Sequence, residues 1–401
     1  MSKTKRTRIA VGVCGGIASY KSYDIVSKLV KMDYDVHVIM TENAKHFVGE
    51  TTFYSLIGNR VITSLFDKNN DDPHAHIEMG KSDFFVVIAA TTNFLGKLAN
   101  GICDDALLSS IMATDSPVII APAMNTKMYN HKATQRNLEI LESYGYHIIE
   151  PQYGKLACGD IGKGKLASVD TIMDHIDYIF NKNDKFKDKK VVITLGGTKN
   201  PIDPVRFISN PSTGKMGMAF ARAFRNAGAK VLAISANRDI EKIHNVEILY
   251  ATSTDEMYKT VLENIADADI FVSAAAVGDL KLEKVFDQKI KKENFDGVLN
   301  VVRTVDILKE VAKLDRVLTV GFAAETENIE QNGRKKLESK NLDYIVINDV
   351  SRKDIGFTSD DNEVILLSKK HKYELDKDSK IEIAKKVIQK IYEENLWCSY
   401  N

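Results

Sequence analysis

Features that would assign this chain of 401 residues to a special class are scarce. No apolar run is long enough to span a lipid bilayer. The four cysteines lie far apart and form no Cys-x-x-Cys pair: Cys14, Cys103, Cys158 and Cys398. This spacing excludes both a disulfide framework and a cysteine zinc site, so any cysteine that matters would act alone.

An excess of charge of one sign is also missing. Lys and Arg number 55, Asp and Glu number 55, and the formal net charge is zero. Proteins that bind nucleic acid usually show a basic excess, so this balance argues against that class. Residues 1–13 are basic and then apolar, but the apolar part is short and indicates a first strand rather than a secretory signal. We expect a cytoplasmic protein that binds neither nucleic acid nor membranes.

What is present is an alternation of apolar strands and amphipathic helices. In the first half we expect strands at 8–13, 36–40, 84–90, 117–121 and 146–149, and helices at 17–31, 93–99, 105–113, 131–143 and 168–180. In the second half we expect strands at 191–194, 230–235, 246–250, 270–275, 317–322 and 344–348, helices at 214–227, 254–265, 305–314, 328–339 and 378–394, and a hairpin before the last helix.

Continuously apolar strands that alternate with helices indicate parallel sheets covered on both faces. Each half is therefore predicted to be a doubly wound α/β domain, in which ligands bind at the carboxyl ends of the strands. The charged segment 181–190 separates the halves. We place the boundary near residue 184, which gives domains 1–183 and 184–401.

The first expected strand ends in Gly15 and Gly16, directly before a helix. Such a turn is either a phosphate site, where free N–H groups face an anion, or a plain strand–helix connection. The spacing is not Gly-x-Gly-x-x-Gly, which favours a mononucleotide such as FMN over NAD. Hydroxyl and amide side chains follow two other strands, at Thr41 and at 91–93. Three polar strand ends together support a ligand site better than one glycine pair.

The second half contains the segment NPSTGKMG at 210–217. A nucleotide-binding P-loop would need Gly at position 209 and Ser or Thr at 216, but the chain has Ser209 and Met216. We therefore reject a P-loop. The segment remains a glycine-containing loop that opens a helix, which is a competent anion site.

Longer blocks resemble known families. In the first half, CGGIASYK, HIEMGKSD, PAMNTKMY and ACGDIGKGKL resemble the flavin-dependent cysteine decarboxylases. In the second half, GGTKNPIDPVRFISNPSTGKMG, SAAAVGD, GFAAET and KNLDYIVINDV resemble phosphopantothenate–cysteine ligase. Together they cover nearly all of 8–395 and resemble the bifunctional coenzyme A biosynthesis family. The resemblance implies a flavodoxin-like flavoprotein domain followed by a Rossmann-like ligase domain.

For the first half, the resemblance implies FMN-dependent decarboxylation of phosphopantothenoylcysteine to 4'-phosphopantetheine. FMN would oxidise the cysteinyl thiol so that the carboxylate can leave as carbon dioxide, and the product would then be reprotonated and reduced. The expected FMN contacts are the polar strand ends and the residues after the glycine pair: Gly15, Gly16, Ile17, Ala18, Thr41, Thr91, Thr92 and Asn93.

Three residues of this half match catalytic positions of the family. His76 matches the essential histidine; spacing alone does not separate it from His74, but the HIExGK register selects it. Asn125, which taken alone would be an ordinary turn residue, matches the amide that holds the substrate carboxylate. Cys158 matches the proton donor and lies in a glycine-rich segment typical of a mobile flap rather than of an inert buried thiol.

For the second half, the resemblance implies that CTP activates 4'-phosphopantothenate as an acyl cytidylate, which cysteine then attacks to form the amide. Asn210 matches the residue that stabilises the intermediate, and Arg206 is placed to reach a phosphate. The expected nucleotide contacts are Ala274, Ala275, Ala276, Asp279, Lys289, Val305, Asp306, Ile307, Leu308, Phe322, Lys336 and Lys340. Without the family, Lys336 and Lys340 would be a solvated helix face. Mg²⁺ is expected with the triphosphate, but no cluster of ligands in the sequence defines its site.

The chain departs from the family at three positions, with Tyr129 for a Trp, Val305 for a Pro and Leu280 for an aromatic residue. Two alternatives remain open, a flavin-binding regulator without activity and an enzyme with only one active half. The resemblance also implies a homo-oligomer with a trimeric flavin half and a dimeric ligase half, in which His76 can serve a neighbouring subunit's flavin.

Overall fold

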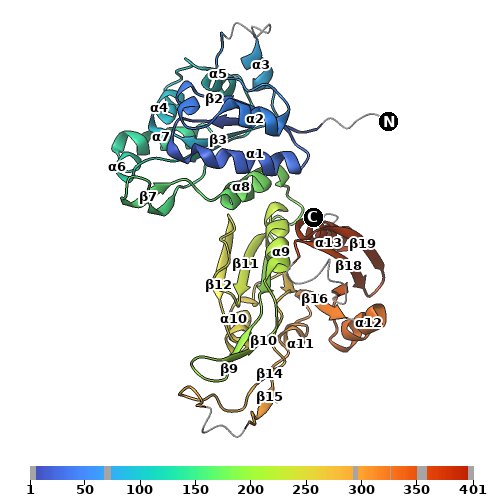
Figure 1. The fold of residues 1–401 in the computed structure, drawn as a ribbon. Coiled ribbons are helices and arrows are strands. Elements are labelled where there is room, and N and C mark those ends of the chain that lie inside the picture. Colours follow the sequence, from blue (N-terminus) through green and yellow to red (C-terminus); the bar gives the residue numbers. More distant parts are fainter. Residues whose placement is uncertain (1–5, 67–73, 292–296, 326, 350–358, 396–401) are drawn as a thin grey trace. The chain divides into compact units, whose positions relative to one another are not determined.

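The computed structural model of the protein describes residues 6–66, 74–291, 297–325, 327–349 and 359–395. The chain divides into two compact units, Met1–Ile179 and Phe180–Asn401 (Figure 1). Both units are α/β, as predicted. None of the described helices is long and apolar enough to cross a lipid bilayer.

The first unit is built on a five-stranded parallel sheet in the order β2-β1-β3-β4-β5. Its strands are β1 (Arg8–Val13), β2 (Asp35–Met40), β3 (Phe84–Ala90), β4 (Val118–Pro122) and β5 (His147–Ile148). Its helices are η1 (Ile17–Lys21), α1 (Ser22–Lys31), η2 (Glu42–His46), α2 (Glu50–Ile57), α3 (Ala75–Gly80), α4 (Thr92–Ala99), α5 (Ala106–Met112), α6 (Thr126–Tyr129), α7 (Lys132–Ser143) and α8 (Val169–Asn181).

Alternation along β1 shows why this sheet is covered on both faces. Ile9 and Val11 face a buried cluster formed with α1, α2 and α8. Ala10 and Cys14 face a second buried cluster formed with α3, α4, α5 and α7. Since both faces are apolar, the strand is continuously apolar, which is the pattern that predicted a parallel sheet.

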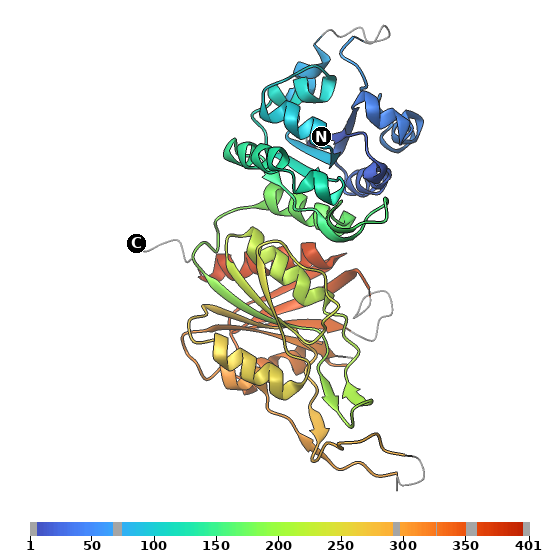
Figure 2. The ribbon, with the colours of Figure 1, turned by 90° about the vertical axis from the view of Figure 1, so that its left-hand side faces the viewer.

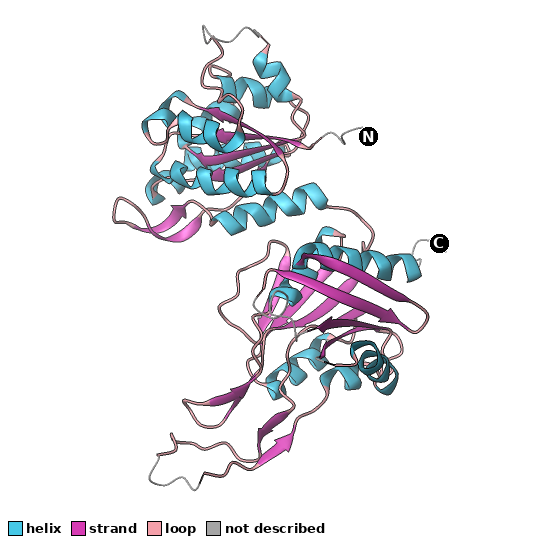
Figure 3. Cartoon of the chain, turned by 45° about the vertical axis from the view of Figure 1, so that its right-hand side comes forward, coloured by secondary structure: helices cyan, strands magenta, loops and turns pink. Residues whose placement is uncertain are grey.

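A short antiparallel hairpin follows this sheet, formed by β6 (Gln152–Lys155) and β7 (Ile161–Lys165). Figure 3 shows it as the magenta hairpin that projects from the first unit. The sequence predicted a glycine-rich flap in this segment and no strands. The glycines at 154, 162 and 164 suppress the alternation of polar and apolar residues by which a strand is recognised.

The second unit carries an eight-stranded sheet in the order β12-β11-β8-β13-β16-β17-β18-β19. The first six strands are parallel: β8 (Lys190–Leu195), β11 (Lys230–Ser235), β12 (Val246–Tyr250), β13 (Ile270–Ser273), β16 (Leu318–Glu325) and β17 (Tyr344–Asp349). The predicted hairpin is β18 (Asp361–Ser368) and β19 (Lys372–Ser379), which extend the sheet in antiparallel fashion.

Two layers of helices enclose this sheet (Figure 2). One buried cluster is formed with α9 (Lys215–Asn226) and α13 (Lys380–Asn395). The other is formed with α10 (Thr254–Asn264), α11 (Ile307–Val311) and α12 (Ile329–Ser339). Two small antiparallel pairs leave the sheet, β9 (Lys199–Pro201) with β10 (Phe207–Ser209) and β14 (Leu280–Leu282) with β15 (Val301–Arg303).

Candidate active sites

The predicted FMN residues gather at the carboxyl edge of the first sheet. Strand order places the ends of β2, β1 and β3 side by side, so Thr41, the Gly15–Gly16 turn and Thr91 are neighbours along this edge. The order reverses between β1 and β3, and open α/β sheets bind ligands at this kind of switch point. A Cβ built on Gly16 would lie 3.9 Å from the Thr91 methyl group, so the two strand ends face each other across that point.

Local contacts fix the shape of this edge. A Cβ on Gly15 would lie 2.7 Å from the backbone carbonyl carbon of Asn43, so the close approach of η2 requires glycine there. The Thr91 hydroxyl caps α4 by accepting from the Phe94 N–H at 3.3 Å. The Thr92 hydroxyl donates to the Met124 sulfur at 3.4 Å and thereby ties α4 to the segment after β4. These contacts leave the N-terminal ends of η1 and α4 side by side, which suits an anionic ligand.

Asn125 and Cys158, both predicted as catalytic, lie in direct contact. The Asn125 side chain caps α6: its Oδ1 accepts from the Lys127 N–H at 2.8 Å. Its Nδ2 then faces the β6–β7 hairpin, 3.3 Å from the Cys158 Sγ and 2.7 Å from the Asp160 Oδ2. The structure therefore brings an amide donor, a thiol and a carboxylate together beside the end of β4.

The hairpin is seated on this site by its glycines. The Met124 N–H donates to the Gly164 carbonyl at 3.0 Å, and Gly164 has φ +146°. A Cβ on Gly164 would collide with the Met124 carbonyl oxygen. The tip is a turn in which the Leu156 N–H donates to the Asp160 carbonyl at 2.8 Å, and its residues 158–160 are exposed. The base of the hairpin is thus fixed to the segment after β4, while the tip that carries Cys158 is exposed and contacts the Asn125 amide.

His76, which was predicted as catalytic, and the buried Cys14 lie apart from this group. His76 lies half-buried in α3, and Figure 1 shows α3 at the opposite end of the unit from α6 and β7. The described chain therefore does not bring His76 to Asn125 and Cys158. Cys14, at the end of β1, is buried, and burial raises the pKa of its thiol, so Cys14 is part of the core.

The second unit contains a cavity of about 870 Å³ at the carboxyl ends of its strands. It lies beside the switch point between β8 and β13, where Gly197 and Ala276 form an isolated bridge. Every predicted ligase residue except Arg206 and Lys289 lines it: Asn210, Ala274, Ala275, Ala276, Asp279, Val305, Asp306, Ile307, Leu308, Phe322, Lys336 and Lys340. A site of this size and position suits a nucleotide.

The lysines of this cavity are paired with carboxylates. Lys336 Nζ lies 2.6 Å from the Glu325 Oε1, and Lys340 Nζ lies 2.8 Å from the Asp306 Oδ2. These two lysines, one in the last turn of α12 and one directly after it, are therefore held by two acidic partners, one at the end of β16 and one before α11. An incoming phosphate chain would compete with these carboxylates for the lysines.

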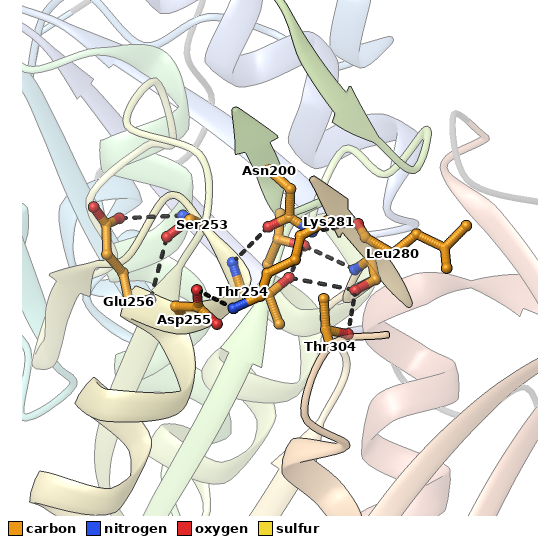
Figure 4. Close-up of polar contacts among 10 residues, drawn as sticks. Asn200, Ser253, Thr254, Asp255, Glu256, Leu280, Lys281 and Thr304 are labelled. Carbon is orange, nitrogen blue, oxygen red and sulfur yellow. Dashed lines mark hydrogen bonds and ion pairs between the residues drawn. The ribbon is translucent and has the colours of Figure 1, made fainter. Parts of the chain in front are cut away.

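A polar network that includes the cavity-lining residues Leu280 and Thr304 holds the loops of the cavity in place (Figure 4). Asn200 is buried; its Nδ2 donates to the Leu280 carbonyl at 2.9 Å and its Oδ1 accepts from the Thr254 N–H at 3.0 Å. The Thr304 hydroxyl donates to the Gly278 carbonyl at 2.8 Å. Because 274–279 and 304–308 supply much of the cavity lining, this network positions the predicted nucleotide contacts.

Arg206 and Lys289 belong to a neighbouring loop cluster. The Arg206 guanidinium donates to the Asp203 Oδ2 from Nε at 2.9 Å and to the Ile290 carbonyl at 2.9 Å. Hydrogen bonds from Arg206 hold the pKa of the buried Asp203 carboxyl well below its ordinary range. Arg206 thus ties the β9–β10 loop to the segment that carries the exposed Lys289. The assignment of both residues to phosphate binding stays a prediction.

Comparison with known proteins places the chain in a family. The family model described as "Flavoprotein" matches residues 1–181, and the model described as "DNA/pantothenate metabolism flavoprotein C-terminal domain" matches 186–395. A coenzyme A biosynthesis bifunctional protein CoaBC from Bacillus subtilis is 43% identical over 385 residues, which cover 94% of this chain and 95% of the relative. The chain belongs to the coenzyme A biosynthesis bifunctional protein family.

The chain is also similar to two further proteins. The CoaBC protein of Haemophilus influenzae is 37% identical over 98% of both chains. A crystal structure of the C-terminal domain of a coenzyme A biosynthesis bifunctional protein CoaBC is 32% identical, covers 53% of this chain and 98% of its own, and has a TM-score of 0.46. The full-length matches show that this family member contains both halves.

The structure adds three residues to the predicted sites of this family member. Asp160 contacts Asn125, and Lys215 and Lys380 line the cavity of the second unit. Lys215 Nζ lies 2.7 Å from the Asp360 Oδ1, while burial and then the neighbouring charge of Lys215 lower the pKa of Lys380. Lys215 belongs to the NPSTGKMG segment, so the sequence could have indicated it as a site residue. No feature of the sequence links Lys380 to the cavity.

The sequence does not indicate which residues would bind a metal ion. Within the described ranges, the structure shows no group of three or more His, Cys, Asp or Glu side chains able to hold a metal ion. The expectation of Mg²⁺ therefore depends on the triphosphate itself, which can supply oxygen ligands.

Proposed function

We propose that the chain makes 4'-phosphopantetheine in two steps. Residues 184–401 ligate cysteine to 4'-phosphopantothenate with CTP, and residues 1–183 decarboxylate the resulting phosphopantothenoylcysteine with FMN. The observation that carries this proposal is family membership over both halves, since the family models cover 1–181 and 186–395. The two sites described above supply the groups that each step needs.

The carboxyl edge of the first sheet fits FMN. The close approach at Gly15, the open space beside Gly16 and the capped N-terminus of α4 form a cradle for a phosphate. We assign the FMN contacts to Gly15–Ala18, Thr41 and Thr91–Asn93. Bound FMN supplies reversible two-electron oxidation of the cysteinyl thiol.

Around that position, the protein has to hold the substrate carboxylate and deliver a proton. The Asn125 amide can donate to a carboxylate without neutralising it, so it holds the group and still allows carbon dioxide to leave. Cys158 lies 3.3 Å from the same amide and is exposed at the hairpin tip, where its thiol can protonate the carbon that loses the carboxylate.

We propose that His76 acts across a subunit interface of a homo-oligomer. Its position in α3, away from the β6–β7 hairpin, supports a role at the flavin of a neighbouring subunit. We therefore propose a trimeric flavin half, and by the same family resemblance a dimeric ligase half.

The cavity of the second unit fits CTP and the acyl cytidylate. Ala274–Ala276 are small enough for a base to lie against the backbone, and Lys336 and Lys340 can move from their carboxylates to the triphosphate. The Asn210 Nδ2 donates to the Val277 carbonyl at 3.2 Å, which holds this amide at the cavity as a donor for the acyl intermediate. Mg²⁺ bound with the triphosphate completes the charge balance.

The test is to purify 1–183 and 186–401 separately beside the full chain. We expect the first fragment to be yellow with an FMN spectrum and to release carbon dioxide from phosphopantothenoylcysteine. We expect the second to form phosphopantothenoylcysteine and pyrophosphate from 4'-phosphopantothenate, cysteine and CTP. A first fragment that stays colourless after FMN is supplied would overturn the flavin assignment, and a yellow fragment without turnover would favour a regulator.

A further inference from the structure

The Asn125 amide that is proposed to bind the substrate carboxylate already binds a carboxylate of the protein. Its orientation is settled by the Lys127 N–H, which donates to Oδ1 at 2.8 Å, because the flipped amide would place two donors against each other. Nδ2 carries two N–H groups. One points to the Asp160 Oδ2 at 2.7 Å and the other to the Cys158 Sγ at 3.3 Å, so neither donor is left for a ligand.

Asp160 is held in this position by little else. Within the described part of the chain, its carboxylate makes a side-chain hydrogen bond only with Asn125. It lies on the exposed tip of the β6–β7 hairpin, next to Gly159, which has φ +92°. The tip can therefore move away at little cost in packing, while the base of the hairpin stays bound to Met124.

We propose that Asp160 occupies the position of the substrate carboxylate in the free enzyme and leaves Asn125 when the substrate binds. This inference rests on the proposed decarboxylase function. Two carboxylates at one amide repel each other, so the substrate can reach Nδ2 only if Asp160 withdraws. After carbon dioxide has left, Asp160 can return to Asn125, so the contact distinguishes a ligand with a carboxylate from a decarboxylated one.

A different role for Asp160 would give the opposite result. If Asp160 only oriented the Asn125 amide for the substrate, its removal would weaken the binding of a carboxylate ligand. If it occupies the carboxylate position, its removal strengthens that binding and leaves a ligand without a carboxylate unaffected. The sign of the change therefore separates the two roles.

The experiment uses two unreactive amides of 4'-phosphopantothenate that lack the thiol. The amide with serine keeps the carboxylate, and the amide with ethanolamine lacks it. Each is titrated into the full-length holoenzyme, and the change in the flavin absorbance reports binding at the decarboxylase site even if the ligase site also binds the compound. The variants are Asp160→Asn, Asp160→Glu and, as a control that removes the same charge from an exposed ion pair with Lys97, Asp104→Asn.

We expect Asp160→Asn to lower the dissociation constant of the serine amide about three- to tenfold, because a charge-assisted hydrogen bond is replaced by a weaker neutral one. The ethanolamine amide should change less than twofold, Asp160→Glu should stay near the wild type, and Asp104→Asn should change neither ligand. Asp160→Ser, with a smaller side chain, should act in the same direction as Asp160→Asn and covers the case in which that variant is unstable.

Unchanged or weaker binding of the serine amide by Asp160→Asn and by Asp160→Ser would overturn the proposed role of Asp160. Release of carbon dioxide from phosphopantothenoylcysteine by the wild type tests the underlying function separately. Its absence would overturn both the function and this inference, whereas normal release combined with weaker binding in the variants would overturn this inference alone.

Discussion

The buried amide of Asn200 offers a sharp test of how the ligase cavity is built. Asn200→Ala removes both of its hydrogen bonds, to the Leu280 carbonyl and from the Thr254 N–H. Leu280 adjoins the 274–279 segment of the cavity, and Thr254 begins α10. The change therefore loosens the connection between the nucleotide loop and the helix layer behind it.

The magnitude follows from the two backbone groups that lose their partner. A buried polar group left without its hydrogen bond costs about 1–3 kcal/mol. Asn200 is 2% exposed, so water has little access to replace it. Two such groups, with partial relaxation, correspond to about 3 kcal/mol of local stability, which is roughly a hundredfold in an opening equilibrium.

Peptide-resolved hydrogen exchange on the full chain measures this opening in each unit separately. We expect exchange in segment 274–282 of the Asn200→Ala variant to rise about a hundredfold, the KM for CTP to rise, and decarboxylation to stay unchanged. Asn264→Ala is the matched control, since Asn264 makes a local bond to the Thr260 carbonyl at the end of α10. Equal exchange in both variants, or an unchanged KM for CTP, would refute a positioning role for Asn200.

Three further predictions concern single residues of the sites. Gly15→Ala should lower the FMN content, because its Cβ would meet the Asn43 backbone at 2.7 Å. The control Gly49→Ala, whose Cβ would have nothing within 4 Å, should keep its FMN, and equal flavin absorbance of the two variants would contradict this prediction. Lys336→Ala should raise the KM for CTP about tenfold, equivalent to ~1.4 kcal/mol, and the exposed Lys335→Ala should not; matching KM values would refute the assignment. Cys158→Ser should still release carbon dioxide but leave the product oxidised, as seen by mass spectrometry; normal 4'-phosphopantetheine at the wild-type rate would rule Cys158 out as the proton donor.

Much of the fold was predictable because its sheets are parallel and buried. The pattern of β1 predicted its strand bounds, and parallel strands necessarily bring their carboxyl ends to one edge, which is why Gly15, Gly16 and Thr91 could be expected to meet. The short helix α3 was not predicted, because six residues that end in glycine show no helical period.

The parts of the sites that escaped prediction depend on contacts between distant segments. Asp160 meets Asn125 only because the β6–β7 hairpin returns to the end of β4. The sequence predicts that Arg206 reaches a phosphate, and this stays a prediction; the ion pair of its guanidinium with Asp203, three residues earlier, was not foreseen. Lys380 begins a helix far along the chain from Lys215, and only the packing of α13 beside α9 brings both to one cavity.

The most direct test of the central claim is a product assay with the purified full chain. It is supplied with 4'-phosphopantothenate, cysteine, CTP and Mg²⁺, and pyrophosphate, carbon dioxide and 4'-phosphopantetheine are measured together. We expect one pyrophosphate and one carbon dioxide for each 4'-phosphopantetheine formed. Pyrophosphate without carbon dioxide, or neither product from a protein that carries FMN, would contradict the claim that both halves are active.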